Sequence, residues 1–254
     1  MSGRIAIVGT GISGLTAAHL LQRRHEITVF EKDDRIGGHS HTVEVADGDR
    51  TLGVDTGFIV YNRRTYPLFC RLLDRLGVAT QPSDMSFSFR DDRQGLEYGA
   101  PEPWRLFAQP TNLVRRRFWG MLQDILRFYR EAPRWLESAP EDVVLSEFLA
   151  AGRYSSAFVD DHLFPVCAAI WSSPHAHMGA YPAAALLRFF RNHGLLSLTD
   201  RPRWRTITGG SRRYVSALTA SFADRIRTGS PVTRIERDAA GAAVHTPGQP
   251  PERF

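Results

Sequence analysis

A glycine-rich loop between an apolar strand and a helix constrains the fold of this chain more than any other feature. Gly9, Gly11 and Gly14 follow the apolar run at 4–8 and open a stretch of good helix formers at 15–24. In such a loop the first glycine permits a tight turn, the second lets the backbone approach a pyrophosphate, and the third packs the helix on the strand. The apolar run at 27–30 then closes a βαβ unit with parallel strands. The pattern predicts an α/β, Rossmann-like dinucleotide-binding domain.

The acid after the second strand narrows the choice of dinucleotide. Glu31 directly follows the run at 27–30, where an acidic side chain accepts hydrogen bonds from the adenosine ribose hydroxyls. The N–H groups of Ile12 and Ser13, at the start of the helix, are expected to face the phosphate charge. Because an acid at this position disfavours a 2′-phosphate, FAD or NAD is predicted in preference to NADP.

From Val8 through Thr42 the chain resembles the flavin-containing amine oxidase superfamily, which includes protoporphyrinogen oxidases and phytoene-type desaturases. The stretch from Glu31 to Gly38, EKDDRIGG, looks like the one that this family places after its ribose acid. The resemblance implies an FAD-dependent oxidoreductase. More loosely, the whole pattern is similar to a bacterial branch of predicted NAD/FAD-binding proteins.

The resemblance also implies roles for single residues after the acid. Arg35 and the backbone of Gly37 and Gly38 are expected against the pyrophosphate, where a guanidinium pairs well with phosphate charge. Lys32 belongs to the same stretch and is included among the cofactor-binding candidates. His39 stands where the family usually has arginine, and we expect it to donate to the phosphate instead.

Two later segments extend the resemblance to the flavin ring and the adenine. The segment at 54–58 is similar to the one that passes the flavin ring in this family, which implies that Thr56, Gly57 and Phe58 contact the cofactor. An ordinary strand and turn is the alternative for this segment. Residues 209–211 and 231–235 resemble the return of the chain to the FAD domain, where the backbone of Val232 is expected to meet the adenine. The sequence also predicts a hairpin around the turn at 47–48 and a strand at 231–236.

Composition changes along the chain suggest an inserted domain. Prolines at 101, 103 and 110 precede a long amphipathic helix predicted at 113–130, and Ser146 is predicted to cap a helix at 147–151. We predict an FAD-binding domain in two parts, 1–80 and 205–254, around a largely helical α+β substrate domain at 81–204. Family members are usually much longer, so the sequence predicts a fragment in which both domains are incomplete.

The chain is basic, with a formal net charge of +5, and Lys32 is its only lysine. Arginine clusters at 115–117 and 201–205 are interpreted as a solvated or helix-capping surface, with contact with acidic lipid headgroups or nucleic acid as the alternative. We expect a small-molecule or lipid-like substrate, peripheral membrane contact and no nucleic-acid partner. The oligomeric state is left open.

The sequence carries no sign of a metal site or of a membrane-spanning segment. Cys70 and Cys167 lie far apart, and His39 and His41 lack a nearby third ligand, so no metal is predicted. No basic leader or long apolar run is present, and a cytoplasmic location is expected, with or without peripheral membrane contact.

The leading function is oxidation of a small or hydrophobic organic substrate by hydride transfer to flavin. Two alternatives stay open: a catalytically incompetent dinucleotide-binding remnant, and an NAD-dependent dehydrogenase, against which the Gly37-Gly38 pair argues. No residue stands out as an acid, base or nucleophile. Candidates for lining a cavity, with core or surface positions as the alternative, are Tyr61, Tyr66, His162, Trp171, His175 and His177.

Overall fold

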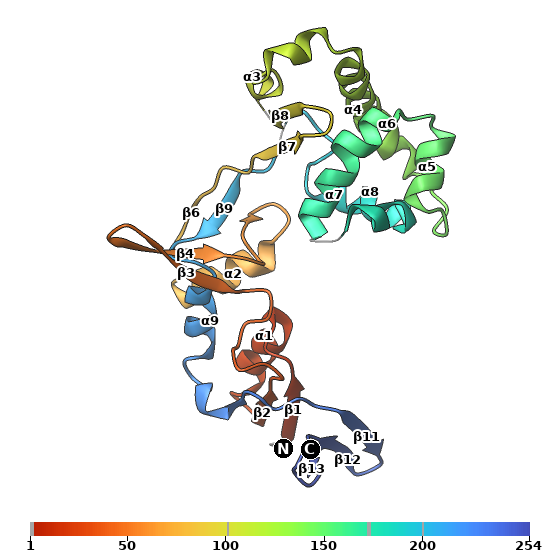
Figure 1. Ribbon diagram of the computed structural model, residues 1–254. Coiled ribbons are helices and arrows are strands. Elements are labelled where there is room, and N and C mark those ends of the chain that lie inside the picture. The colour runs from red at the N-terminus through yellow and green to blue at the C-terminus, as the bar shows by residue number, and fades with distance from the viewer. Residues whose placement is uncertain (1–2, 101, 172–173, 200) are drawn as a thin grey trace. The chain divides into compact units, whose positions relative to one another are not determined.

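The chain folds into two compact units in the computed structural model, which describes residues 3–100, 102–171, 174–199 and 201–254 (Figure 1). The first unit combines Met1–Ser83 with Arg203–Phe254, and the second is Asp84–Pro202. One unit is therefore interrupted in sequence by the other. That the first binds FAD and the second binds substrate stays a prediction.

The first unit begins with the predicted βαβ arrangement. Strand β1 (Arg4–Val8), helix α1 (Ile12–Leu21) and strand β2 (Glu26–Phe30) follow one another, and β2 also pairs with β10 (Ile226–Arg227). All pairs are parallel, in the order β1-β2-β10. Leu15 of α1 is fully buried in the core beside the sheet. The α/β class and the parallel βαβ unit are thus confirmed.

Three small sheets and two helices complete the first unit. The hairpin predicted around 47–48 is present, with Val43 opposite Val54 and Val45 opposite Leu52. Helix α2 ends at Gly77, whose φ of 64° is the left-handed conformation of a glycine cap. The elements are β3 (Thr42–Asp47), β4 (Arg50–Asp55), β5 (Tyr61–Asn62), α2 (Pro67–Leu76), β6 (Thr80–Pro82), β9 (Trp204–Ile207), α9 (Arg212–Thr219), the 3-10 helix η4 (Ala223–Arg225), β11 (Arg234–Asp238), β12 (Gly241–His245) and β13 (Glu252–Arg253).

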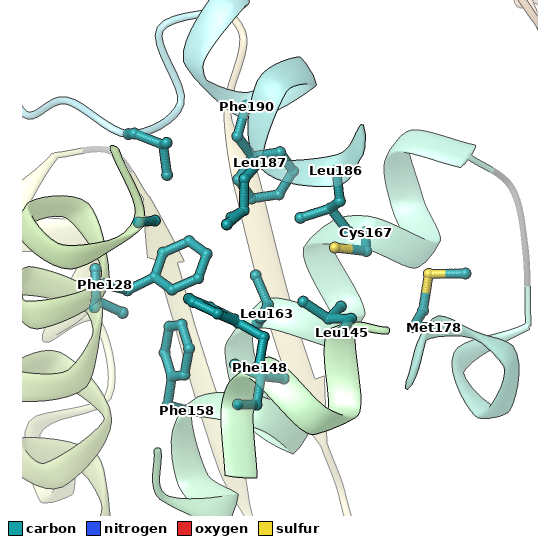
Figure 2. Close-up of a cluster of buried hydrophobic side chains, with 14 of the residues drawn as sticks. Phe128, Leu145, Phe148, Phe158, Leu163, Cys167, Met178, Leu186, Leu187 and Phe190 are labelled. Atoms are coloured by element: carbon teal, nitrogen blue, oxygen red, sulfur yellow. The ribbon is translucent and has the colours of Figure 1, made fainter. Parts of the chain in front are cut away.

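The second unit is largely helical and has its own core. Phe128 of its longest helix packs against the rings of Phe148, Phe158 and Phe190, which come from three other helices (Figure 2). The elements are β7 (Phe87–Asp91), β8 (Leu96–Ala100), α3 (Pro103–Leu106), the 3-10 helix η1 (Pro110–Val114), α4 (Arg116–Trp135), α5 (Leu145–Ala151), α6 (Ser156–Phe158), the π-helix η2 (Val159–Leu163), α7 (Phe164–Trp171), the 3-10 helix η3 (His175–Ala180) and α8 (Ala183–Asn192).

Three predicted element boundaries are wrong. Ser146 is not a cap, because α5 starts at Leu145, whose N–H donates to the Tyr181 carbonyl at 2.8 Å. Helix α4 starts at 116 instead of 113, since Pro110–Val114 forms a separate 3-10 turn. The strand predicted from 231 begins at Arg234, because Pro231 has no N–H to donate to a sheet.

Candidate cofactor site

The glycine-rich loop leaves the end of β1 in a conformation that only glycine adopts readily. Gly9 has φ of 92°, and its N–H donates to the Phe30 carbonyl at 2.7 Å, which ties the loop to the end of β2. A side chain at Gly14 would collide with the Gly9 carbonyl. Gly9 is therefore required by backbone conformation and Gly14 by the close contact between helix and loop.

The space in front of this loop is open. A Cβ atom built on Gly9 or Gly11 meets no other atom within 4 Å. Helix α1 starts at Ile12, so the N–H groups of Ile12 and Ser13 belong to its first turn, where no intrahelical acceptor exists. Free donors beside an open backbone surface fit a phosphate group.

Glu31, at the end of β2, is fixed to the loop by Thr10. Its Oε2 accepts the Thr10 N–H at 2.8 Å and also the Thr10 hydroxyl, while Oε1 accepts the Asp33 N–H at 3.1 Å. Burial raises the pKa of this carboxyl, but the hydrogen bonds from Thr10 and Asp33 outweigh it, so the pKa lies below its ordinary value of 4.5. Glu31 is thus a carboxylate at neutral pH.

The second glycine pair lies against the first loop. Gly37 N–H donates to the Thr10 carbonyl at 3.1 Å, and a Cβ on Gly38 would lie 3.0 Å from the Cα of Gly11. Arg35 donates to the Gly38 carbonyl at 2.9 Å and thereby holds this turn. The structure therefore brings the predicted glycines together around Thr10.

Lys32 and His39 flank this turn on the surface. Both side chains are exposed, Lys32 directly after Glu31 and His39 directly after Gly38. The His39 carbonyl accepts the Phe58 N–H at 2.7 Å. The position of His39 thus links the glycine pair to the segment at 56–58, whereas contact of either side chain with phosphate stays a prediction.

The segment at 56–58 runs beside residues 39–41. Thr56 N–H donates to the His41 carbonyl at 2.9 Å, and a side chain at Gly57 would collide with the His39 carbonyl. Phe58 packs edge to face on Phe69 of α2, with ring centroids 5.3 Å apart. The close backbone contact explains a glycine at 57 without reference to a ligand.

Asp55 anchors this segment to the start of α9. Its carboxylate accepts the Ser211 N–H at 2.9 Å, the Ser211 hydroxyl at 2.7 Å and the Thr42 hydroxyl at 2.6 Å. The Tyr214 hydroxyl of the same helix bonds the buried Ser40 hydroxyl. Thr10, Asp55 and Tyr214 were not predicted as site residues, although a hydroxyl inside the glycine motif and an acid next to Thr56 are visible in the sequence.

The chain returns beside Glu31 before it reaches Val232. The Glu31 carbonyl accepts the Ser230 N–H at 2.7 Å, and the Asp33 carbonyl accepts the Gly229 N–H at 2.9 Å. Val232 follows two residues later and is partly buried. The structure therefore places Val232 shortly after a segment that is bonded to Glu31 and Asp33.

The other candidates are not part of this loop. Tyr61 is buried in the core of the first unit, and Tyr66 stands next to helix α2. His162 and Trp171 pack among aromatic rings of the second unit, and the His177 side chain is exposed. The side chain of His175 lies outside the described ones.

The described part of the chain contains neither a candidate metal site nor a candidate membrane-spanning helix. Within 3–100, 102–171, 174–199 and 201–254, no three His, Cys, Asp or Glu side chains are grouped so that they could hold a metal ion. No helix in these ranges has the length and apolar content needed to cross a bilayer.

A parallel βαβ unit whose glycine loop meets an acid and a second glycine pair defines a dinucleotide-binding protein. The family model described as flavin-containing amine oxidoreductase matches residues 12–252. The chain belongs to this family, whose cofactor is FAD. The fold and the open, donor-lined loop fit that cofactor.

Curated relatives are between a quarter and a third identical to this chain over the aligned region. AofH of Mycobacterium tuberculosis, which carries the name of a flavin-containing monoamine oxidase, is 29% identical over 94% of this chain and 53% of its own length. The flavin-dependent L-tryptophan oxidase RebO of Lentzea aerocolonigenes is 26% identical over 95% of this chain and 54% of its own. The chain thus spans about half the length of these relatives.

Solved structures share the fold. Cyclohexylamine oxidase from Brevibacterium oxydans matches with a TM-score of 0.68 at 21% identity, over 99% of this chain and 56% of its own. A fatty acid isomerase from P. acnes matches with a TM-score of 0.60 at 19% identity, over 97% of this chain and 56% of its own. At these identities the likeness concerns the fold alone.

Proposed function

We propose that this chain carries the adenosine-diphosphate half of the FAD site of an amine-oxidising flavoenzyme. The observation that carries the proposal is the junction at Thr10, where the glycine loop, the Glu31 carboxylate and the Gly37 turn are joined by hydrogen bonds. In this arrangement the N–H groups of Ile12 and Ser13 take the pyrophosphate, and the remaining acceptor site of Glu31 takes a ribose hydroxyl.

The remaining predicted contacts extend this site in both directions. Arg35, Lys32 and His39 supply positive or donor groups beside the Gly37-Gly38 turn, and the backbone around Val232 borders the adenine. Thr56, Gly57 and Phe58 run along the path toward the flavin ring. When bound, FAD supplies the electron acceptor that takes a hydride from the substrate, and a second acceptor reoxidises it.

The substrate class that the relatives favour is a small amine. A monoamine oxidase by name, an L-tryptophan oxidase and a cyclohexylamine oxidase all stand among the similar proteins. The substrate then loses a hydride and a proton at the C–N unit and leaves as an imine. A lipid-like substrate is the second candidate, because a fatty acid isomerase shares the fold.

Cofactor binding is the first experiment. The purified chain is titrated with FAD and, separately, with NAD, and quenching of flavin or protein fluorescence is followed. Saturable FAD binding that Gly14→Ala abolishes is expected, whereas Gly120→Ala on α4 should bind as the parent does. Preference for NAD would favour the dehydrogenase, and binding of neither would favour the remnant.

A chain that retains FAD allows the substrate to be tested directly. The FAD complex is mixed without oxygen with alkylamines, arylalkylamines or unsaturated fatty acids, and bleaching of the oxidised-flavin absorbance is recorded. Bleaching by amines alone supports the amine proposal. Bleaching by fatty acids alone, or their isomerisation without lasting bleaching, would overturn it. A stable flavin spectrum with every compound and no change in the fatty acids would limit this chain to cofactor binding.

A further inference from the structure

The outer face of α4, defined as Arg116, Trp119, Gln123, Leu126, Arg130 and Arg134, is exposed along the whole helix. Successive helix residues are about 100° apart, so these six side chains lie within an arc of about 80°. The opposite side of the helix is buried in the core of the second unit, through Phe118, Met121, Ile125, Phe128 and Ala132. The outer face is therefore a continuous stripe with no role in that core.

The outer face of α4 carries positive charge and no negative charge. Among the ion pairs of the described residues, none involves Arg116, Arg130 or Arg134. The two carboxylates of this helix are engaged elsewhere, because Asp124 accepts from Arg127 and the Ser155 N–H, and Glu131 accepts from the Tyr154 hydroxyl. The first exposed carboxylate after the helix belongs to Glu137. Three cationic groups thus share one face, and none of them takes part in an ion pair among the described residues.

Apolar side chains stand within and beside these charges. Val114 is 83% exposed, Leu113 54%, Leu126 53% and Trp119 44%. The indole N–H of Trp119 donates to the Leu113 carbonyl at 2.9 Å, so the η1 turn lies directly against the start of the outer face. Figure 1 shows α3 and the start of α4 at one end of the unit. Four apolar side chains with this degree of exposure are typical of a surface that binds a membrane or another protein.

We infer that the outer face of α4, with Leu113 and Val114, docks on an anionic phospholipid bilayer. Arginines that are not engaged in ion pairs attract acidic headgroups, tryptophan favours the interfacial depth, and the aliphatic side chains at 113 and 114 enter the acyl boundary. Nucleic acid carries the same phosphate charge but has no apolar region in which the Val114 side chain could be buried. The inference does not rest on the proposed oxidation, because FAD binding involves the other unit.

Vesicle sedimentation tests this inference on the full chain. The probes are vesicles of phosphatidylcholine alone and of phosphatidylcholine with phosphatidylglycerol. Binding is expected only with phosphatidylglycerol present and should weaken as salt is added. Replacing each arginine of the pair by glutamine, as in Arg116→Gln with Arg130→Gln, should weaken binding about fivefold per residue, or roughly 25-fold together. Val114→Asp should also weaken it.

Matched control variants distinguish binding through the outer face of α4 from non-specific binding to vesicles. Leu68→Asp replaces an apolar side chain that is 69% exposed on α2, and Arg23→Gln with Arg24→Gln removes two exposed charges from the first unit. Both controls should bind vesicles as the parent does, and FAD affinity should be equal in all variants. Absent binding to the anionic vesicles would overturn the inference, as would equal losses in controls and test variants. A dimer that Val114→Asp dissociates would assign the face to a second copy instead.

Discussion

One carboxylate oxygen of Glu31 binds both hydrogen-bond donors of Thr10: Oε2 accepts the Thr10 N–H at 2.8 Å and also the Thr10 hydroxyl. The acid proposed for the ribose is therefore already part of the protein's own framework. An ionised carboxylate has about four acceptor sites, and Thr10 and Asp33 use three of them. Glu31 can thus fix the glycine loop and still accept from a ligand.

Glu31→Gln should destabilise the first unit even without cofactor. The amide would direct an N–H group at donors of Thr10 or Asp33, and an unmatched buried polar group costs about 1 to 3 kcal/mol. Chemical denaturation followed by circular dichroism measures the free energy of unfolding. Glu26→Gln, at the exposed start of β2, is the control, and an equal loss there would contradict this role for Glu31.

The two helical glycines at 14 and 120 should respond to alanine in opposite directions. Gly14→Ala brings a methyl group into the Gly9 carbonyl, whereas a Cβ at Gly120 meets nothing within 4 Å. Gly120→Ala should stabilise the chain by up to about 1 kcal/mol, because alanine has the higher helix propensity. Gly14→Ala should lower the unfolding temperature, and an unchanged value would show that the loop has room to move.

Asp55→Asn should loosen the segment at 56–58. Asp55 accepts three hydrogen bonds from Ser211 and Thr42, and one amide cannot accept them all. We expect a loss of about 1 to 3 kcal/mol in unfolding free energy and faster hydrogen exchange at the start of α9. Asp47→Asn in the same hairpin leaves these contacts intact. Identical exchange in the two variants would contradict an anchoring role.

Acid should weaken the second unit through His162. Burial, and then the charge of Arg201, lowers the pKa of His162 from 6.5 to about 4, so the folded chain keeps the imidazole neutral while the unfolded chain takes up a proton. The unfolding free energy should therefore fall as the pH drops from 6.5 toward 4, by about 2 kcal/mol from this group. His162→Gln should flatten that slope. The exposed His177→Gln variant should keep it, and equal slopes in all three proteins would refute the assignment.

The local parts of the fold were predictable from sequence because short segments determine them. Alternating apolar runs and a glycine motif define β1, α1 and β2, and the left-handed cap at Gly77 follows from one glycine after a periodic helix. The start of α5 was not predictable in the same way. It depends on a hydrogen bond from Leu145 to Tyr181, which is distant in sequence.

The candidate site shows the same division. Gly9, Gly14 and Glu31 were singled out because the motif fixes their spacing. The hydrogen bonds between segments distant in sequence were not predicted. Asp55 and Ser211 are 156 residues apart, and the sequence around either residue gives no sign of the other. Long-range polar pairs of this kind follow only from the assembled fold.

Strand β10 pairs in parallel with β2, with Ile226 beside Val29. The two paired strands are therefore synthesised far apart in time. The first strands emerge early, but their third partner is synthesised only after the whole of Asp84–Pro202. During that interval the inserted unit, which has its own hydrophobic core, can fold, while one edge of β2 has no partner strand. In nascent chains of this protein, the sheet begun by β1 and β2 gains its third strand only when β10 has been synthesised. Until then the unpaired edge of β2 favours aggregation.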